Sequence, residues 1–274
     1  MRDHKLTLGT HTLVMGVVNV TPDSFSDSGE AFKLDAAVER GINLTAAGAD
    51  ILDIGGESTR PGSDPVPLEE ELSRVIPVIA ALSRKVDIPI SVDTYKSEVA
   101  RRAIDAGASM VNDISAGNFD PEMAGIVAET GVGAVLMHIK GTPRDMQQNP
   151  VYNDLLDEVI SYLTRAVEKF ETGGVSRDRI LVDPGIGFGK LLVHNLELIR
   201  RIGELHNIAC GVLLGTSRKS FIGLLTEKPV QDRLSGTIAS IVAGAMFGAD
   251  MVRVHDVEQV VDALKVVDSI SIYA

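Results

Sequence analysis

The sequence predicts an α/β protein, a (β/α)8 TIM barrel with a short N-terminal β-hairpin ahead of its first strand. Eight short apolar runs alternate with longer helical patterns along the 274 residues. Eight parallel strands, each followed by a helix, form a closed barrel of this size. Each run has a polar residue at or near its C-terminal end, as expected if the strands converge on one face that carries an active site. A doubly wound open sheet is the alternative, because periodicity in a sequence does not report closure.

The predicted strands are short, rich in β-branched residues and separated by helix-length intervals. They span 13–20, 49–54, 88–93, 109–114, 133–139, 180–184, 211–217 and 250–256. The segment KLTLGTHTL over 5–13 is interpreted as the small hairpin, which would cover the bottom of the barrel. Because the chain has no low-complexity stretch and no linker-like change in composition, residues 1–274 are expected to form a single domain.

Helix signals fill the intervals between the strands. Three glutamates at 69–71 crowd one helix start, where acidic side chains complement the macrodipole, and Pro77 inside that pattern predicts a kink or a late start. Asp120-Pro121 predicts an N-cap followed by proline at the first helical position. An apolar stripe over 155–170 predicts a long amphipathic helix that ends at Gly173-Gly174.

Charge and cysteine content limit the classes of partner. The net charge of −12 argues against nucleic acid or an anionic membrane as the main partner, since both select for basic surfaces. The single cysteine, Cys210, excludes an internal disulfide and fits a reducing compartment. The N-terminus has no apolar signal region and no apolar run approaches the length of a membrane span, so we expect a cytoplasmic protein.

Hydrogen-bonding side chains end three of the predicted strands, at Asp93, Asn112 and Asp183. Buried polar groups must be paired, so these side chains either bond to one another or receive a ligand rich in N–H and C=O groups. A fused nitrogen heterocycle with an amino group and a lactam meets this demand, since one carboxylate accepts two N–H bonds.

Cationic side chains follow the last two strands. Lys219, Arg253 and His255 lie where barrels of this type often hold a phosphate group. The glycine-dense segment DPGIGFGK over 183–190 would let the backbone approach a ligand, and Phe188 within it would cover an aromatic face.

The sequence offers one candidate side chain for binding a metal ion. Cysteine-rich zinc spacing and paired histidines are both missing from the sequence. A diphosphate substrate would favour Mg²⁺, held mostly by phosphate oxygens and water with one side-chain oxygen. Asn19, at the end of the first predicted strand, is the candidate for that oxygen.

Eight segments at these strand ends together resemble the dihydropteroate synthase family, in order and over nearly the whole chain. They are GVVNVTPDSFSDSG, DIGGESTRPG, VDT, VNDIS, MHIKGTPRDMQ, DPGIGFGK, GTSRKSF and RVHD. The resemblance implies a TIM barrel that joins 6-hydroxymethyl-7,8-dihydropterin diphosphate to p-aminobenzoate. Diphosphate would be released and 7,8-dihydropteroate made for folate biosynthesis, with Mg²⁺ as cofactor and aryl sulfonamides as mimics of p-aminobenzoate.

The resemblance also implies a role for each matching residue. The pterin would be held by Asp93, Asn112, Met137, Asp183 and Lys219; the diphosphate and its Mg²⁺ by Asn19, Arg253 and His255; and the p-aminobenzoate by Thr59, Arg60, Phe188 and Ser220. Lys219, Asp93 and Asp183 would be catalytic, the two carboxylates by stabilising a cation-like state as diphosphate departs. The family also suggests a homodimer, with the helix over 237–248 at its interface.

Two loops are expected to close the site. Residues 21–32 combine glycine, hydroxyls and two phenylalanines, a composition that fits a lid over the substrates. Residues 55–66, GGESTRPGSDPV, are stiffened by two prolines and are expected to form one wall for the second substrate. We expect this wall to order only when the pterin and diphosphate half is filled.

Three other activities fit parts of the pattern. A pterin-binding methyltransferase, acting on methyltetrahydrofolate and a corrinoid protein, would share the strand-end carboxylates and carboxamide. A non-enzymatic pterin carrier would not need a phosphate-binding cluster, and an aldolase would need a Schiff-base lysine, for which Lys219 is the candidate. The intact STRPG and TSRKSF segments favour the synthase.

Overall fold

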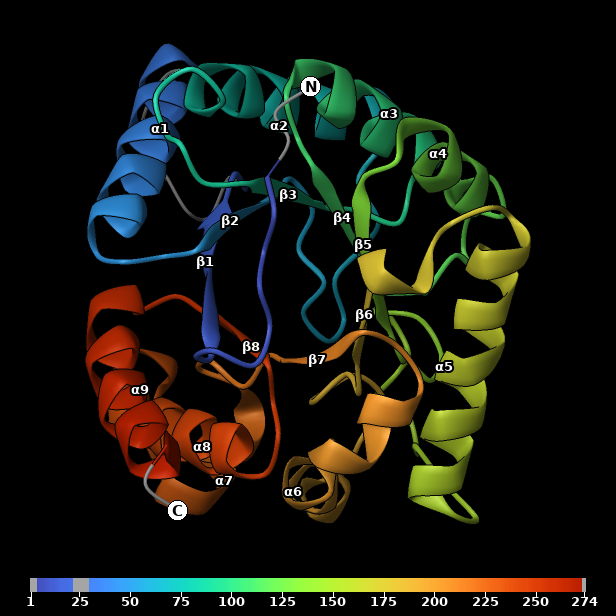
Figure 1. The fold of residues 1–274 in the computed structure, drawn as a ribbon, viewed down its shortest axis with the longest axis vertical. Coiled ribbons are helices and arrows are strands. Elements are labelled where there is room, and N and C mark those ends of the chain that lie inside the picture. Colours follow the sequence, from blue (N-terminus) through green and yellow to red (C-terminus); the bar gives the residue numbers. More distant parts are fainter. Residues whose placement is uncertain (1–3, 22–29, 273–274) are drawn as a thin grey trace.

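Eight parallel strands close into a barrel with helices around it (Figure 1). The computed structural model describes residues 4–21 and 30–272. Its strands are β1 (Leu13–Asn19), β2 (Ile51–Gly55), β3 (Ile90–Asp93), β4 (Met110–Asp113), β5 (Gly133–Met137), β6 (Ile180–Asp183), β7 (Gly211–Leu214) and β8 (Met251–Val254). All eight fall within one residue of the predicted runs or inside them.

Pairing between the first and last strands decides between a barrel and an open sheet. β1 lies parallel to β8, with Leu13 opposite Met251 and Gly16 opposite Val254. The predicted TIM barrel is therefore confirmed, and the open-sheet alternative is wrong.

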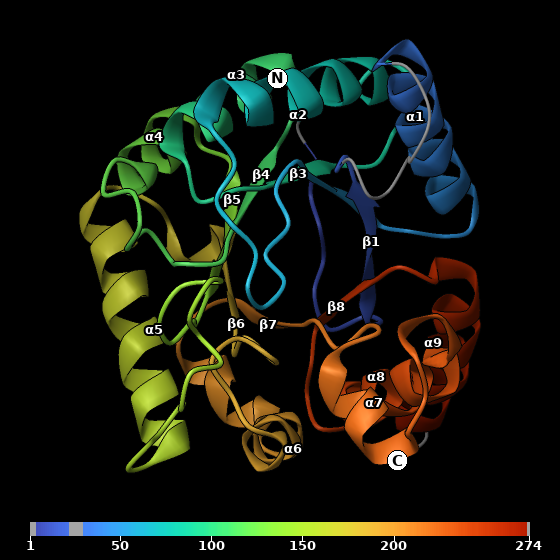
Figure 2. The ribbon, with the colours of Figure 1, turned by 180° about the vertical axis from the view of Figure 1, so that it is seen from behind.

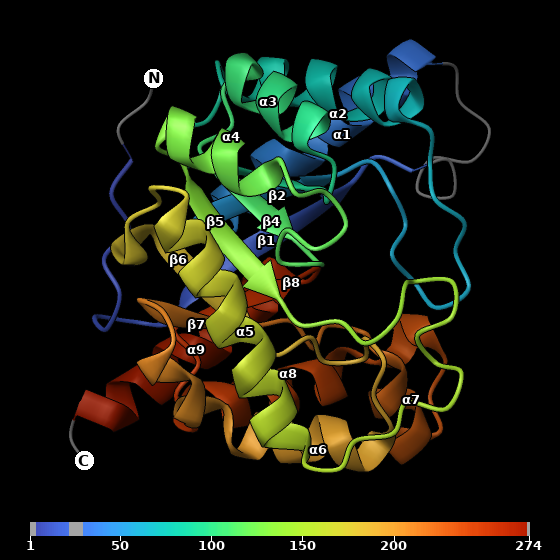
Figure 3. The same ribbon diagram turned by 90° about the vertical axis from the view of Figure 1, so that its right-hand side faces the viewer.

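The helices surround the barrel in chain order (Figures 1 and 3). They are α1 (Glu30–Ala46), α2 (Leu68–Leu82), α3 (Ser97–Ala106), α4 (Met123–Thr130), α5 (Leu155–Thr172), α6 (Leu192–Arg200), α7 (Ser220–Thr226), α8 (Leu234–Met246) and α9 (Val257–Ile272). Pro77 lies inside α2, so it does not mark a late start. The predicted cap at Asp120 with Pro121 as the first helical residue is wrong, because α4 starts at Met123 and Glu122 is its N-cap. The Asp120 carboxylate instead accepts from Glu122 N with one oxygen and from Ser97 N, at the start of α3, with the other.

Two apolar layers make up the core. The larger layer lies between the strands and the helices, and Phe170 of α5 is fully buried in it. The smaller layer fills the N-terminal half of the barrel interior with side chains from most of the strands, among them Met15, Ile51, Val135 and Met251. This leaves the opposite, C-terminal end of the barrel for polar side chains.

The N-terminal segment covers the bottom of the barrel without forming the predicted hairpin. Within the described residues 4–12 there is no strand. Leu6 and Leu8 pack against the interior apolar cluster, and this segment crosses the barrel in Figure 1. The backbone N–H of Thr12 donates to Asp268 on α9 at 3.1 Å rather than to a neighbouring strand. The hairpin prediction is therefore wrong, because the backbone of this segment bonds to a helix side chain instead of to a second strand, and the covering role is confirmed.

The C-terminal end of the barrel faces the viewer in Figure 2, with the loop over 55–66 lying across it. The predicted lid over 21–32 lies outside the described residues, except for Thr21 and the start of α1. No helix in the described part of the chain combines the length and apolarity needed to span a membrane.

Candidate active site

Asp53 on β2 connects three other strands at the C-terminal end of the barrel. Its side chain is fully buried, and its Oδ2 atom accepts from Asn112 Nδ2 at 3.0 Å and from Arg253 Nε at 2.6 Å. The same guanidinium donates from Nη2 to Asp93 Oδ2 at 2.6 Å. Asp93 and Asn112 are also register partners on β3 and β4. The structure thus brings together Asp93, Asn112 and Arg253, and it adds Asp53, to which the sequence analysis assigned no role.

The charges in this group are strongly coupled. Burial raises the pKa of Asp93 to about 7, with Arg253 opposing the shift and Asp53 adding to it. Burial alone would lower the pKa of Arg253, but Asp53 and Asp93 outweigh it and raise the pKa above its usual range. Asp53 Oδ1 has no hydrogen-bond partner among the described residues and is buried. A buried carboxylate oxygen without a partner is unfavourable unless a donor approaches it.

Asp183 and Lys219 meet beside Arg253. A Cβ atom on Gly215 would lie 3.9 Å from Asp183 Oδ2, 3.9 Å from Arg253 Cβ and 4.0 Å from Lys219 Nζ, so these side chains surround one bare glycine. Asp183 Oδ1 accepts from Gly185 N at 2.7 Å. Burial raises the pKa of Asp183, with Lys219 the main opposing charge. Burial lowers the pKa of Lys219 to about 8 against the pull of Asp183.

The DPGIGFGK segment curls over this pair. Lys219 Nζ donates to the carbonyl of Ile186 and lies 4.6 Å from the centre of the Phe188 ring. Lys190, which the sequence analysis did not single out, supports the segment from inside: its Nζ atom lies 2.8 Å from His138 Nδ1 and donates to Phe188 O at 3.0 Å. Burial lowers the pKa of Lys190 well below its usual range. An apolar and glycine-rich context around a lysine was the only sequence signal for this role.

Met137 lies on the floor of the site. It is buried in a small apolar cluster with Ile114, Ile139 and Met146, against which Tyr95 and Phe188 pack. Met137 and Asp183 are register partners on β5 and β6. An apolar side chain next to a carboxylate suits a flat ring with N–H groups on its edge.

His255 is held as a neutral imidazole. Ser217 Oγ accepts from the backbone N–H of His255 at 3.2 Å and lies 2.9 Å from Nδ1 of the same residue. The hydroxyl can also donate its proton to Nδ1, and in that tautomer the ring proton is on Nε2. Burial, together with Arg253 and Arg218, lowers the pKa of His255 to about 3. Burial and two neighbouring guanidinium groups thus disfavour the cationic form of His255 that we expected from the sequence.

Arg218 and Asn19 complete the rim. Arg218 pairs with Asp256, with Nε donating to Oδ2 at 3.0 Å, and so has a structural partner. Asn19 ends β1 opposite Gly55 and is half-buried; its Oδ1 atom lies 3.8 Å from where a Cβ on Gly55 would be. The Asn19 side chain makes no hydrogen bond to the rest of the described chain. Its oxygen is thus free to act as a ligand.

Thr59 and Arg60 lie on the loop over 55–66, which is ordered over the barrel mouth (Figure 2). The loop tip is fixed by Gly62 N, which donates to Pro143 O at 2.9 Å in the loop after β5. Neither the Thr59 hydroxyl nor the Arg60 guanidinium has a hydrogen bond or ion pair within the described residues. No hydrogen bond or ion pair joins them to Phe188 or to Ser220, which is exposed at the start of α7. Within the described residues, the four members of the expected p-aminobenzoate subsite are therefore not linked to one another by hydrogen bonds or ion pairs.

Metal ligands of the usual kind do not cluster here. Among residues 4–21 and 30–272 no group of three or more His, Cys, Asp or Glu side chains could hold a metal ion. The carboxylates that could contribute, Asp53 and Asp93, are occupied by Arg253. One free carboxamide oxygen at Asn19 fits a Mg²⁺ ion held mainly by a phosphorylated substrate, and does not fit a metal held by protein alone.

A closed barrel with ionisable side chains gathered at the C-terminal ends of its strands defines a TIM-barrel enzyme. A family model described as pterin binding enzyme matches residues 15–255. The chain is 46% identical to a dihydropteroate synthase of Synechocystis over 96% of its own length and 91% of that protein. Two solved structures of Xanthomonas albilineans dihydropteroate synthase are also similar. The structure with 4-aminobenzoic acid has a TM-score of 0.90 and 45% identity, covering 95% of this chain and 93% of the other. The structure with 7,8-dihydropteroate has a TM-score of 0.87 and 42% identity, covering 97% and 95%. The chain belongs to the pterin-binding enzyme family, among the dihydropteroate synthases.

Proposed function

We propose that this chain joins 6-hydroxymethyl-7,8-dihydropterin diphosphate to p-aminobenzoate, releasing diphosphate and forming 7,8-dihydropteroate. The observation that carries the proposal is the buried group of Asp53, Asp93, Asn112 and Arg253 at the barrel mouth. It occurs in a chain closely similar to a protein solved with 4-aminobenzoic acid and with 7,8-dihydropteroate. The reaction belongs to folate biosynthesis and makes the protein a transferase.

The pterin half of the proposed site consists of Asp93, Asn112, Met137, Asp183 and Lys219. Charge-assisted hydrogen bonds from the N–H groups of the pterin would go to the buried carboxylates, which favours binding inside a low-dielectric pocket. Met137 would contact the face of the ring. Lys219 has a pKa lowered to about 8 by burial and would donate to a ring acceptor instead of its present carbonyl partner.

Asn19, Arg253 and His255 form the proposed diphosphate half. Neutral His255 would donate from Nε2, and Arg253 would supply the positive charge. A Mg²⁺ ion, when bound through Asn19, would neutralise negative charge on the departing diphosphate. Because Arg253 is bonded to Asp53 and Asp93, the diphosphate would have to share this guanidinium with them.

The proposed p-aminobenzoate half lies between the loop over 55–66 and the DPGIGFGK segment. Thr59 and Arg60 would form one wall, while Phe188 and Ser220 would form the other. A guanidinium can stack on an aryl ring or meet a carboxylate, and a hydroxyl can bond to either end of the substrate. In the reaction the amine nitrogen forms a C–N bond to the methylene carbon while the C–O bond to diphosphate breaks, with loss of one proton from nitrogen. Asp93 and Asp183 would stabilise positive charge on the pterin during this displacement.

We also propose that residues 1–274 act as one domain and that two copies form a homodimer through α7 and α8. Leu224 and Leu225 on α7, Met246 at the end of α8 and Phe247 directly after it are exposed, with Leu224 at 68% and Met246 at 65%. Exposed large apolar side chains can mark an interface between proteins when they gather in one patch. Sedimentation equilibrium gives the mass of the particle and decides between one copy and two.

The test of the proposed reaction measures diphosphate release from the pterin diphosphate with p-aminobenzoate added or omitted. We expect release that depends on the aryl amine, with 7,8-dihydropteroate appearing in equal amount. Methyl transfer from methyltetrahydrofolate to a corrinoid protein, without amine-dependent diphosphate release, would instead support the methyltransferase. The ordered STRPG loop at the barrel mouth favours the synthase, because only the synthase has to position a separate aryl amine for attack on the pterin.

A further inference from the structure

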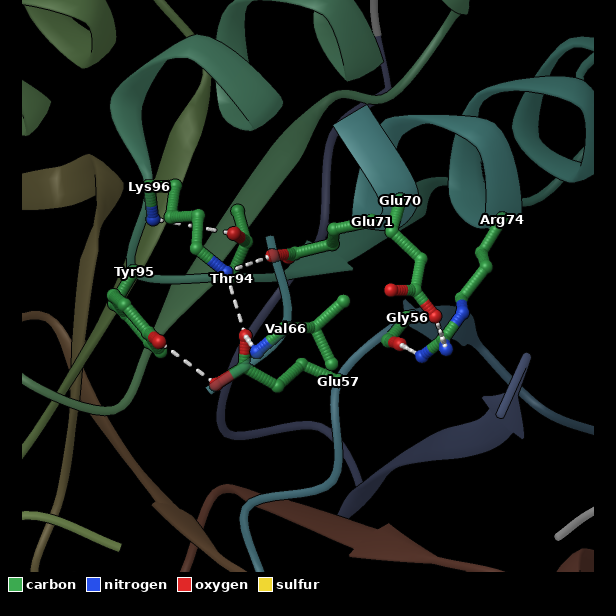
Figure 4. Close-up of polar contacts among 9 residues, drawn as sticks. All are labelled: Gly56, Glu57, Val66, Glu70, Glu71, Arg74, Thr94, Tyr95 and Lys96. Carbon is green, nitrogen blue, oxygen red and sulfur yellow. Dashed lines mark hydrogen bonds and ion pairs between the residues drawn. The ribbon is translucent and has the colours of Figure 1, made fainter. Parts of the chain in front are cut away.

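Glu57 closes the base of the loop that carries Thr59 and Arg60. Its side chain is only 6% exposed although it follows β2 in a surface loop. Oε2 accepts from Val66 N at 3.1 Å, nine residues further along the chain, so the loop starts and ends on the same carboxylate (Figure 4). We call Glu57, Val66, Tyr95 and Lys96 the Glu57 clamp, since the last two residues also bond to Glu57.

The clamp ties the loop to the segment that follows β3. Tyr95 Oη donates to Glu57 Oε1 at 2.7 Å, and Lys96 Nζ donates to Oε2 at 2.6 Å. Both residues follow Asp93 closely in the chain, so the backbone that presents Asp93 to the pterin half also holds the clamp. Tyr95 packs edge-on against Phe119 with ring centres 5.4 Å apart. It also packs against the apolar cluster that contains Met137.

A second carboxylate shares the same lysine but makes no hydrogen bond to the loop within the described residues. Lys96 Nζ also donates to Glu71 Oε2 on α2, and the Glu71 side chain is 1% exposed (Figure 4). The cluster therefore holds two carboxylates and one ammonium group away from water. Buried ion pairs contribute little net stability compared with apolar packing, but they fix one geometry where a charge would otherwise lack a partner.

The loop over 55–66 is consequently anchored at its base and at its tip. The clamp holds its base, and the bond from Gly62 N to Pro143 O holds its tip. Ser63 N and Ser63 Oγ both donate to Arg60 O, at 3.0 and 2.8 Å, which shapes the turn between them. The expectation that this loop orders only after the pterin half is filled does not fit these contacts, because all of them are made within the chain.

We propose that Glu57 is a positioning residue for the second substrate. By holding the base of the loop it sets where Thr59 and Arg60 stand relative to Phe188 and the pterin half. The assignment of those residues to p-aminobenzoate rests on the proposed function. The Glu57 carboxylate bonds to Val66, Tyr95 and Lys96 of the clamp, so we assign it a role through the loop and not on the reacting atoms.

The test compares Glu57→Gln with Glu71→Gln. Both changes remove one carboxylate charge from Lys96, but only Glu57 bonds to Val66 and Tyr95. We expect Glu57→Gln to raise the KM for p-aminobenzoate about tenfold, the size of one charge-assisted hydrogen bond. Affinity for a phosphate-free pterin, measured by calorimetry, should change less than about twofold. Glu71→Gln should leave the KM for p-aminobenzoate within about twofold while lowering thermal stability as much as Glu57→Gln does.

Amide hydrogen exchange needs no substrates and therefore tests the Glu57 clamp independently of the proposed reaction. Amide hydrogen exchange over 58–66 should be faster in Glu57→Gln than in the native chain and in Glu71→Gln. Tyr95→Phe, which removes one donor and keeps the ring, should shift both exchange and KM in the same direction by a smaller amount. Equal KM changes in the two glutamine variants, or unchanged exchange over 58–66 in Glu57→Gln, would overturn the positioning role. Faster exchange in a protein that releases no diphosphate with p-aminobenzoate would leave the clamp in place and reject the proposed function instead.

Discussion

Arg253 Nη2 on β8 donates to Asp93 Oδ2 on β3 at 2.6 Å, across the mouth of the barrel. The sequence placed these two residues in different halves of the site, Asp93 with the pterin and Arg253 with the diphosphate. Their direct bond, together with the shared partner Asp53, makes the halves energetically dependent. Removing Arg253 would leave two carboxylates without their main counter-charge, whereas removing His255 would leave every carboxylate pairing intact.

Arg253→Gln should therefore act on stability and on both ligands. Breaking a buried pair by removing one partner costs about 3–5 kcal/mol of unfolding free energy. We expect a loss in that range from urea denaturation, together with weaker binding of a phosphate-free pterin. Placing Asp93→Asn in the same chain should reduce the cost of Arg253→Gln, because one of the stranded charges is then absent. Strictly additive effects of the two substitutions would show that the two side chains are not coupled.

Asp93→Asn alone should act mainly on the pterin. The change keeps the volume of the side chain and removes the charge that receives the ring N–H groups. Charge-assisted bonds contribute about 1.5–3 kcal/mol, so titration calorimetry with a pterin analogue should show binding weakened by about 10–100-fold. Asp105→Asn, the same change at an exposed position on α3, is the control and should bind as the native chain does. Native-like affinity in folded Asp93→Asn would remove Asp93 from the pterin site.

Gly185→Ala, in the DPGIGFGK segment, should lower the free energy of unfolding by more than the positive φ angle alone accounts for. Gly185 has φ of +70°, and a Cβ there would lie 1.9 Å from the carbonyl oxygen of His138. Gly9 has φ of +82° with nothing within 4 Å of its Cβ position, so Gly9→Ala reports the angle alone. Left-handed geometry costs a residue with a side chain about 1–2 kcal/mol. Denaturation should give about that loss for Gly9→Ala and a larger one for Gly185→Ala, and equal losses would mean that the loop moves freely away from His138.

Sequence patterns predicted the barrel because a strand that is buried on both faces is apolar at consecutive positions, and such runs are recognisable in the sequence. Strands such as Ile180–Asp183 are continuous apolar runs that end in a polar residue, and the closed parallel sheet requires both features. The hairpin over 5–13 was wrong because a short alternating segment does not reveal where its backbone N–H groups go. In the protein, Thr12 uses the Asp268 carboxylate, which lies 256 residues away in sequence.

The candidate site was predicted unevenly for a related reason. Residue types at strand ends predicted that Asp93, Asn112, Asp183 and Lys219 would share one face. Which polar atom pairs with which was not readable, because it depends on side chains brought together across the barrel. The roles of Asp53 between Asn112 and Arg253 and of Glu57 between Tyr95 and Lys96 are of this kind. The neutral state of His255 also follows from burial and neighbouring charge, neither of which a sequence position records.

The stability of the protein at acidic pH depends on the surroundings of His255 and can therefore be used to test them. Its pKa in the folded chain is lowered to about 3 by burial and by Arg253 and Arg218, whereas an exposed histidine titrates near 6.5. Between these values the unfolded chain binds more protons than the folded chain. The contribution of His255 is therefore complete above about pH 6.5 and is lost as the pH falls toward 3. Between pH 7 and pH 5 the loss is at most about 2 kcal/mol.

His255→Gln should remove this part of the pH dependence. The difference in unfolding free energy between pH 7 and pH 5, measured with urea, should be smaller in the variant by up to about 2 kcal/mol. Burial lowers the pKa of His138 to about 2, so His138 also makes the folded chain less stable as the pH falls. Asp93, with its raised pKa, changes the stability in the opposite direction. Both residues are present in the native chain and in the variant. Their contributions cancel in the comparison. Added diphosphate should also protect the native chain at pH 5, because an anion beside the ring stabilises its protonated form. Identical pH dependence in the two proteins would mean that the pKa of His255 is the same in the folded and the unfolded chain, and that burial, Arg253 and Arg218 do not lower it.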